Sequence, residues 1–165
     1  MKKKIGKKLK RHLKKKNIFK LIKFKKKYLK NIYTWRNEKS ARDNSLIKNK
    51  FSFNEHKIWI KSKSKNKSNR IFIFLKNNIP IGTCSIIKKK SFYYFNYLLK
   101  KNSRNKGFSK IMLKKFITNV KKTRIKKKIL AVVIKTNKLS YKLLTNSGFE
   151  LKSMQKEYFV LKLAI

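Results

Sequence analysis

The chain has 165 residues, a length that suits one domain, and carries 50 Lys and Arg against 5 Asp and Glu, a formal net charge of +45. Its hydrophobic fraction of 41% is too high for a disordered basic tail and indicates a packed core. Lys or Asn interrupts every long apolar stretch before the roughly 18 residues that a membrane span requires. The single cysteine, Cys84, excludes an intramolecular disulfide framework and a Cys-rich zinc site, so we expect a cytoplasmic protein with no metal and no membrane span.

The high charge has two explanations. Dense Lys and Arg neutralise phosphates, so nucleic-acid binding is the first. The second is codon bias, because the 44 Lys, 16 Asn, 19 Ile and 12 Phe all have A/T-rich codons. Arg, which recognises phosphates and bases through two parallel hydrogen bonds, is present only 6 times. We therefore give the charge little weight as evidence of function and keep non-specific nucleic-acid binding open.

The first half of the chain predicts an arm, a strand and two helices. Residues 1–16 hold 10 of the 50 basic residues and are predicted to be a disordered basic arm or a frayed helix, which leaves 17–165 as the folded domain. Apolar and Lys residues alternate over 18–24, as in a strand, and apolar residues at 28–35 follow helical spacing. Ser52-Phe53-Asn54-Glu55 has the form of a capping box that starts a helix, and the polar run 61–70 predicts a loop.

The middle of the chain predicts a hairpin, a buried strand and a helix. Residues 70–75 and 79–87 are rich in β-branched and aromatic residues and read as a hairpin. Residues 91–99 contain no charge in a very basic chain, which predicts a central strand buried on both faces. Apolar residues recur at i+4 over 108–120, which predicts an amphipathic helix.

The last part of the chain completes a crossover. Residues 129–134 are again free of charge and predict a buried parallel strand, so strand, helix and strand form a right-handed βαβ unit. Residues 137–147 predict a helix, ended by Gly148 in the C′ position, and 158–163 alternate like a closing strand. The expected fold is α/β, with a mixed, mostly antiparallel sheet, a central βαβ crossover and flanking helices.

The turn between the central strand and the 108–120 helix is a candidate phosphate site. It reads Arg104-Asn105-Lys106-Gly107-Phe108-Ser109, with Lys110 adding positive charge. A flexible turn that opens a helix directs unpaired N–H groups and the positive end of the helix at one point, which suits a pyrophosphate. An ordinary helix-opening turn explains the same residues equally well.

With its surroundings, this turn resembles the signature of the GNAT superfamily of acetyl-CoA-dependent N-acetyltransferases. The family pattern R-x-x-G-x-G/A is matched by Arg104 and Gly107, with Ser109 as the last small residue. A second stretch, residues 137–149, is similar to the family's N-x-x-S-x-x-L-Y/F-x-x-x-G-F segment. The resemblance covers about residues 18–165 and implies an acetyltransferase fold.

The resemblance implies that acetyl-CoA is the acetyl donor and lies against the central strand. Backbone groups around Leu98 and Leu99 would hold the pantetheine arm, and Asn137 and Ser140 would border the CoA tail. The residues expected at the pyrophosphate are those of the turn: Arg104, Asn105, Lys106, Gly107, Phe108, Ser109 and Lys110.

The sequence offers two candidate proton-transfer groups, Tyr141 and His56. The family implies direct transfer to an amine, in many members with a Tyr as proton donor to the departing thiolate, but Leu144 stands at that position. Tyr141 is a substitute candidate, and core packing is the alternative for a helical aromatic. His56 is the histidine outside the arm and a candidate catalytic group near neutral pKa; partial exposure without a role is its alternative.

The amino-terminal half carries a further resemblance. Trp35-Arg36-Asn37-Glu38 together with Ser52 and Glu55-His56 is similar to the pattern of GNAT enzymes that acetylate nucleotide-linked amino sugars in pseudaminic and related nonulosonic acid synthesis. This implies a small-molecule amine as substrate, surface-glycan assembly as the process, and Arg36, Asn37 and His56 as substrate-binding residues. The alternatives are a protein or ribosomal-protein acetyltransferase and a non-catalytic basic RNA-binding protein; core and capping roles also explain these residues.

Overall fold

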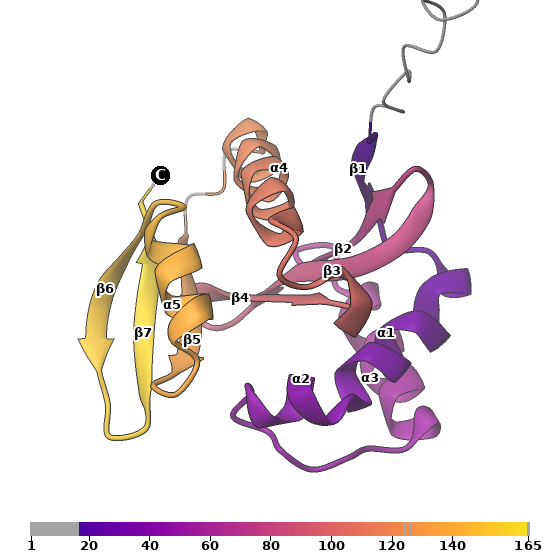
Figure 1. Cartoon of the computed structure of the whole chain (residues 1–165), viewed down its shortest axis with the longest axis horizontal. Helices are drawn as coiled ribbons and strands as arrows, with labels where there is room; N and C mark the ends of the chain where they lie inside the picture. The colour runs from indigo at the N-terminus through magenta and orange to yellow at the C-terminus, as the bar shows by residue number, and fades with distance from the viewer. Residues whose placement is uncertain (1–16, 124, 126, 165) are drawn as a thin grey trace, which may run out of the picture.

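The computed structural model describes residues 17–123, 125 and 127–164, and the predicted basic arm, 1–16, lies outside them. Seven strands form one sheet in the order β1-β2-β3-β4-β5-β7-β6 (Figure 1). Their bounds are β1 Phe19–Lys23, β2 Arg70–Lys76, β3 Ile79–Lys88, β4 Phe92–Leu99, β5 Lys128–Ile134, β6 Phe149–Met154 and β7 Tyr158–Leu163. Only the β4–β5 pair is parallel among these strands, and β4, the intervening helix and β5 form the crossover. The predicted fold class is confirmed.

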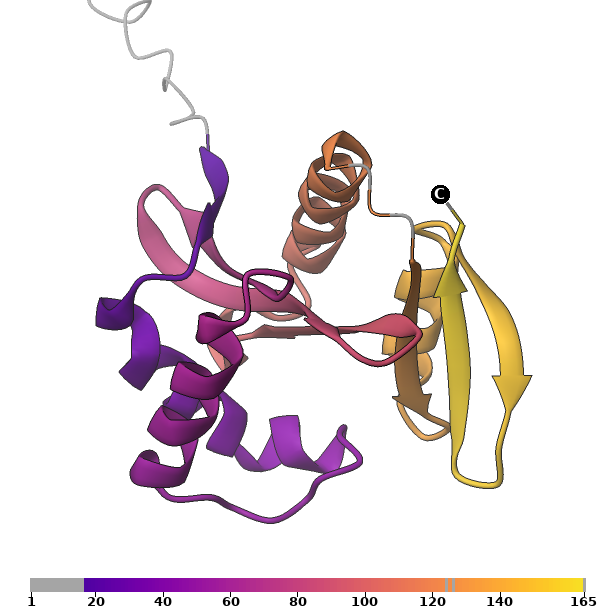
Figure 2. The ribbon, with the colours of Figure 1, turned by 180° about the vertical axis from the view of Figure 1, so that it is seen from behind.

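Five helices flank the sheet in the described ranges. They are α1 Leu29–Asn37, α2 Lys39–Asp43, α3 Phe53–Lys65, α4 Phe108–Lys122 and α5 Lys138–Thr145, with short 3-10 turns η1 at Lys26–Tyr28 and η2 at Lys101–Ser103. Helices α1 to α3 lie on one side of the central strands and α4 on the other, as the two opposite views show (Figures 1 and 2). No helix in these ranges combines the length and the apolar character needed to cross a membrane.

Each face of the sheet has its own core. On one face, α4 buries Met112 and Phe116, and the Phe116 ring lies 4.4 Å from that of Phe95 on β4. On the other face, Ile32 of α1 and Ile60 of α3 pack with Ile73 and Leu75 of β2 in a separate buried cluster. The sheet is therefore held from both sides, which is the layered arrangement expected for an α/β domain.

Local signals explain the hairpin and the third helix. The β2–β3 hairpin turns at Asn77 and Asn78, both with positive φ (49° and 65°), as the tight two-residue hairpin turns require. At the start of α3, the Ser52 hydroxyl accepts from the Glu55 N–H at 3.2 Å, and the Glu55 carboxylate accepts from the Ser52 N–H at 2.6 Å. The predicted capping box is confirmed.

Two element boundaries predicted from the sequence were wrong. The predicted loop 61–70 begins five residues too early, because α3 continues to Lys65; Lys favours helix, and neither Gly nor Pro interrupts this run. Gly148 is not at C′: α5 has its C-cap at Asn146, and Gly148 follows two residues later with φ 91°. Helix α2 and the exposed strand β6 were not predicted, since neither has an apolar periodicity.

Strand β4 differs from the sequence expectation in a way that matters for function. It was predicted to be buried on both faces, but only Phe95 and Leu99 are fully buried and its other residues are half-buried. The reason is its pairing: β4 and β5 are paired at three positions, from Phe92 to Tyr94, and then diverge (Figure 1). The second half of β4 therefore borders a cleft and not a neighbouring strand.

Candidate active site

The cleft between the diverging strands has a volume of about 280 Å³. Strands β4 and β5 form its sides, α5 and the turn before α4 close one end, and α2 with the end of α1 closes the other. Eight of the residues predicted for function line it: Arg36, Leu98, Leu99, Arg104, Asn105, Ser109, Asn137 and Ser140. Residues far apart in the sequence are thus brought to one site.

The N-terminus of α4 opens without a side-chain cap. Gly107 is the N-cap residue, with φ 72°, and no side chain accepts a hydrogen bond from the first turn. The first backbone N–H groups of a helix have no intrahelical acceptor, so those of Phe108 and Ser109 are available to an anion. A Cβ on Gly107 would meet no atom within 4 Å, which shows that the space over this turn is open. These features fit a pyrophosphate.

The N-terminus of α5 is capped instead. The side-chain oxygen of Asn137 accepts a hydrogen bond from the Ser140 N–H at 3.1 Å. The Ser140 hydroxyl lies 2.7 Å from the Tyr97 hydroxyl of β4. The two residues predicted to border the CoA tail are therefore fixed at the edge of the cleft, and Asn137 already uses its oxygen as a cap.

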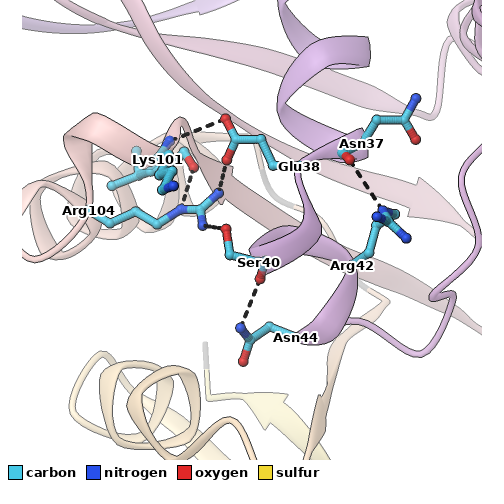
Figure 3. Close-up of polar contacts among 8 residues, drawn as sticks. Asn37, Glu38, Ser40, Arg42, Asn44, Lys101 and Arg104 are labelled. Carbon is cyan, nitrogen blue, oxygen red and sulfur yellow. Dashed lines mark hydrogen bonds and ion pairs between the residues drawn. The ribbon is translucent and has the colours of Figure 1, made fainter.

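Arg104 is held by protein groups (Figure 3). Its guanidinium donates to the Glu38 carboxylate at 2.5 Å, to the Ser40 hydroxyl at 2.6 Å and to the Leu99 carbonyl at 2.9 Å. Arg104 thereby ties the turn before α4 to the junction of α1 and α2. In this structure it orders the wall of the cleft, while Lys106 and Lys110 are exposed beside the open helix end.

A second, smaller cavity of about 60 Å³ adjoins the cleft. Four residues line both: Arg36, Asn96, Tyr97 and Leu98. Burial lowers the pKa of Arg36 and the nearby Tyr94 opposes this; a guanidinium stays charged in proteins. Among the described residues that line the two cavities, none is Asp or Glu. Arg36 is thus a half-buried cation at the point where the cavities meet.

His56 lines the second cavity. It is 5% exposed, and its Nε2 atom has no hydrogen-bond partner among the described residues. The ring stacks on Phe51 and on Trp59, with centroid distances of 5.5 and 6.1 Å. Burial first, and then the charge of Arg36, lowers the pKa of His56 to about 4. The imidazole is therefore neutral near pH 7, with one nitrogen free to accept.

Six predicted site residues line neither cavity: Asn37, Lys106, Gly107, Phe108, Lys110 and Tyr141. The Asn37 side chain donates to the Phe51 carbonyl at 2.8 Å and accepts from the Phe51 N–H at 3.3 Å, so it braces Phe51 against His56. Tyr141 packs on Phe159, with ring centroids 4.6 Å apart, while buried Leu144 lines the cleft. The Cys84 thiol lines the second cavity, but burial raises its pKa, so it remains a protonated, poor nucleophile.

Sequence reasoning did not find Tyr97. Its only signal was its place in the uncharged run 91–99, which holds three tyrosines. Which of these faces a cleft depends on where β4 loses its partner, and the sequence does not encode that point in a local pattern.

Comparisons with known proteins agree with this geometry. The family model described as "Acetyltransferase (GNAT) domain" matches residues 19–150, so the chain belongs to the GNAT acetyltransferases. No curated protein matches the sequence. Membership of the family confirms the expected fold and enzyme class, an acyltransferase, and supports acetyl-CoA as the acetyl donor.

Several solved structures share the fold at low sequence identity. A domain from Methanocaldococcus jannaschii has a TM-score of 0.78 and 16% identity, over 90% of this chain and 99% of that one. The spermidine N-acetyltransferase of Vibrio cholerae, in complex with CoA and spermine, has a TM-score of 0.74 and 16% identity, over 87% and 92%. The Campylobacter jejuni N-acetyltransferase PseH, in complex with acetyl coenzyme A, has a TM-score of 0.67 and 20% identity, over 88% and 98%.

Proposed function

We propose that the protein transfers an acetyl group from acetyl-CoA to the primary amine of a nucleotide-linked amino sugar, in the cytoplasm and for surface-glycan synthesis. The observation that carries this proposal is the position of Arg36, which is half-buried and lines both cavities where they meet. Its guanidinium is matched to phosphate oxygens, which it can bind through two parallel hydrogen bonds.

The charge of the site favours an anionic acceptor over a polyamine. No carboxylate among the described residues lines either cavity, and the two described ion pairs, Lys39–Asp43 and Arg104–Glu38, do not involve Arg36. A polyamine would bring further positive charge to Arg36 with nothing to balance it. A sugar joined to phosphates brings the opposite charge. The similarity of Arg36, Asn37 and His56 to the amino-sugar acetyltransferase pattern supports the same class.

The chain's own residues supply binding groups and one hydrogen-bond acceptor for the amine. When bound, acetyl-CoA supplies an activated thioester. The free N–H groups at the start of α4, with Lys106 and Lys110 beside them, are suited to hold its pyrophosphate. Arg36 binds the acceptor's phosphates, and the neutral Nε2 of His56 accepts a hydrogen bond from the acceptor amine, whose proton passes on to water. Cys84, with its protonated thiol, does not form an acyl-enzyme, which agrees with direct transfer.

The test is a competition between acceptor classes. Purified protein is incubated with acetyl-CoA and a panel of nucleotide-linked amino sugars, spermidine and lysine peptides, and acetylated products are identified by mass spectrometry. We expect acetylation of at least one nucleotide sugar, with an at least tenfold increase of its KM in Arg36→Gln. Arg70→Gln, a basic residue at the start of β2 that lines neither cavity, is the matched control. Acetylation of peptides or spermidine and of no sugar would contradict the proposal.

A further inference from the structure

The site lacks the helical tyrosine that many related enzymes use as proton donor. Leu144 stands at that position and is 1% exposed. Tyr141, one turn earlier, packs against Phe159 and does not line the cleft. The pKa of a thiol lies above neutral pH, so the departing sulfur takes up a proton, and a donor beside it assists its departure.

Tyr97 is a phenol at the point where the cleft and the second cavity meet. It lines both the cleft and the second cavity, and its hydroxyl is 2.7 Å from the hydroxyl of Ser140. The contact joins β4 to α5 across the region where β4 and β5 diverge. The ring is held by stacking on Phe95, with centroids 5.9 Å apart and planes 19° from parallel. The position of the hydroxyl is thus set by packing on one side and by a hydrogen bond on the other.

The other residues that line both cavities do not serve this purpose. They are Arg36, Asn96 and Leu98. The arginine holds its proton too tightly, and the amide and the apolar side chain have no acidic proton to give. Burial raises the pKa of Tyr97, and the bond with Ser140 opposes this, so the phenol keeps its proton at neutral pH.

We propose that Tyr97 is the catalytic acid of this acetyltransferase and protonates the sulfur that leaves. As the amine nitrogen forms its bond to the acetyl carbon, the carbon–sulfur bond breaks and its electron pair remains on sulfur. Tyr97 transfers its hydroxyl proton to that sulfur, and a proton from solvent restores the phenol through the Ser140 hydroxyl. The proton lost by the amine leaves to water, so the reaction is balanced. The inference rests on acetyl transfer, which belongs to the proposed function, and not on the identity of the acceptor.

Tyr97→Phe tests the role in turnover, because it keeps the ring on Phe95 and removes only the hydroxyl. With any amine that the wild type acetylates, we expect kcat to fall about 100-fold, the lower end for loss of a general acid, with KM for acetyl-CoA within twofold. The decline of kcat at alkaline pH should disappear as well. Tyr93→Phe is the matched control, since Tyr93 lies on the same strand, packs against the core and lines neither cavity. Equal kcat in wild type and Tyr97→Phe would overturn the proposal.

A second measurement does not need turnover. The pKa of the CoA thiol is determined in the bound state from the ultraviolet absorbance of the thiolate, in wild type and in Tyr97→Phe. A hydroxyl that donates to the sulfur stabilises the thiolate, so we expect a higher thiol pKa in the variant; identical values would overturn the proposal. An error in the acceptor class would appear differently, as a wild type that acetylates no sugar while the thiol pKa still depends on Tyr97.

Discussion

Arg104 and Glu38, 66 positions apart in the chain, form an ion pair with a 2.5 Å contact between Nη2 and Oε2. Their side chains are 26% and 20% exposed, so the pair is mostly shielded from water. Arg104 comes from the turn that opens α4 and Glu38 from the junction of α1 and α2. The pair therefore fixes the donor side of the cleft relative to the helices that carry the acceptor residues.

Removing Glu38 should destabilise the protein. In Glu38→Ala the guanidinium of Arg104 loses its charged partner in a half-buried position, and we expect the free energy of unfolding to fall by about 1–3 kcal/mol. Chemical denaturation measures this change. Asp43→Ala is the control, because the Lys39–Asp43 pair is 83% and 50% exposed and such surface pairs contribute about 0–1 kcal/mol. Equal losses in the two variants would mean that the Arg104 pair has no special role.

Gly107→Ala should weaken acetyl-CoA binding, and Gly148→Ala should not. Both glycines have positive φ, 72° and 91°, and neither Cβ would meet an atom within 4 Å. Each variant therefore carries a similar backbone strain of about 1–2 kcal/mol, but only the Gly107 methyl group enters the space over the α4 N-terminus. Calorimetric titration with acetyl-CoA compares the two affinities. Unchanged affinity in Gly107→Ala would remove this turn from the donor site.

Thermal shifts of the wild type, together with RNA binding by Gly107→Ala, distinguish a specific acetyl-CoA site from binding by charge alone. We expect acetyl-CoA to raise the melting temperature of the wild type, at moderately high salt, more than ATP or heparin does. Equal shifts with all three anions would favour the nucleic-acid alternative. RNA binding that persists at physiological salt and survives Gly107→Ala would favour it further, since purely electrostatic binding weakens steeply as salt rises.

His56 should make stability depend on pH in the acid range. The ordinary pKa of a histidine is 6.5, and the pKa of His56 in the folded protein is about 4. Between pH 6.5 and pH 4 the unfolded chain therefore takes up a proton at His56 that the folded protein does not. The free energy of unfolding should fall as pH decreases through this window, by at most about 3 kcal/mol. Above pH 6.5 both states are neutral at His56 and the effect is absent.

Urea denaturation at several pH values measures this slope, and His56→Gln should flatten it. Glu55 adds its own acid sensitivity below its ordinary pKa of 4.5, because the hydrogen bonds with Ser52 lower its pKa. That contribution is common to both proteins and cancels in the comparison. The same slope in the variant and the wild type would show that His56 titrates normally.

Asn37 should act on the acceptor site through Phe51. Asn37→Ala removes both hydrogen bonds to the Phe51 backbone and with them the brace that stacks Phe51 on His56. We expect KM for the acceptor to rise several-fold and KM for acetyl-CoA to stay unchanged, as steady-state kinetics can determine. Asn66→Ala is a suitable control, because the Asn66 side chain bonds within an exposed loop. A rise in both KM values would indicate a general loss of structure.

The sequence predicted elements whose signals are local. The Asn77-Asn78 hairpin, the capping box at Ser52 and the apolar stripe of α4 each depend on residues within a few positions of one another, and all three are present. The end of α3 was misplaced because Lys and Ser are compatible with both helix and loop. Strand β6 was missed because an exposed edge strand needs no apolar pattern.

The site residues that lie in sequence motifs were predictable. Those brought together by the divergence of β4 and β5 or by contacts between distant segments were not. Arg104, Ser109 and Ser140 lie in contiguous motifs, and all three line the cleft. By contrast, the pairing of Asn37 with Phe51 and of Arg104 with Glu38 uses side chains that had been expected to meet ligands. Hydrogen bonds between distant segments decide such roles, and a single sequence does not specify them.

By itself, the sequence determined the α/β class, the order of the elements, the acetyltransferase motifs and the scarcity of carboxylates, since each follows from local patterning and composition. Only the tertiary structure decided that β4 leaves β5 after three pairs and opens a cleft, that Arg36 joins two cavities, and that Tyr97 reaches Ser140. The physical reason is that a strand's free edge and the neighbours of a buried side chain depend on how distant segments pack, which the period of any one segment does not contain.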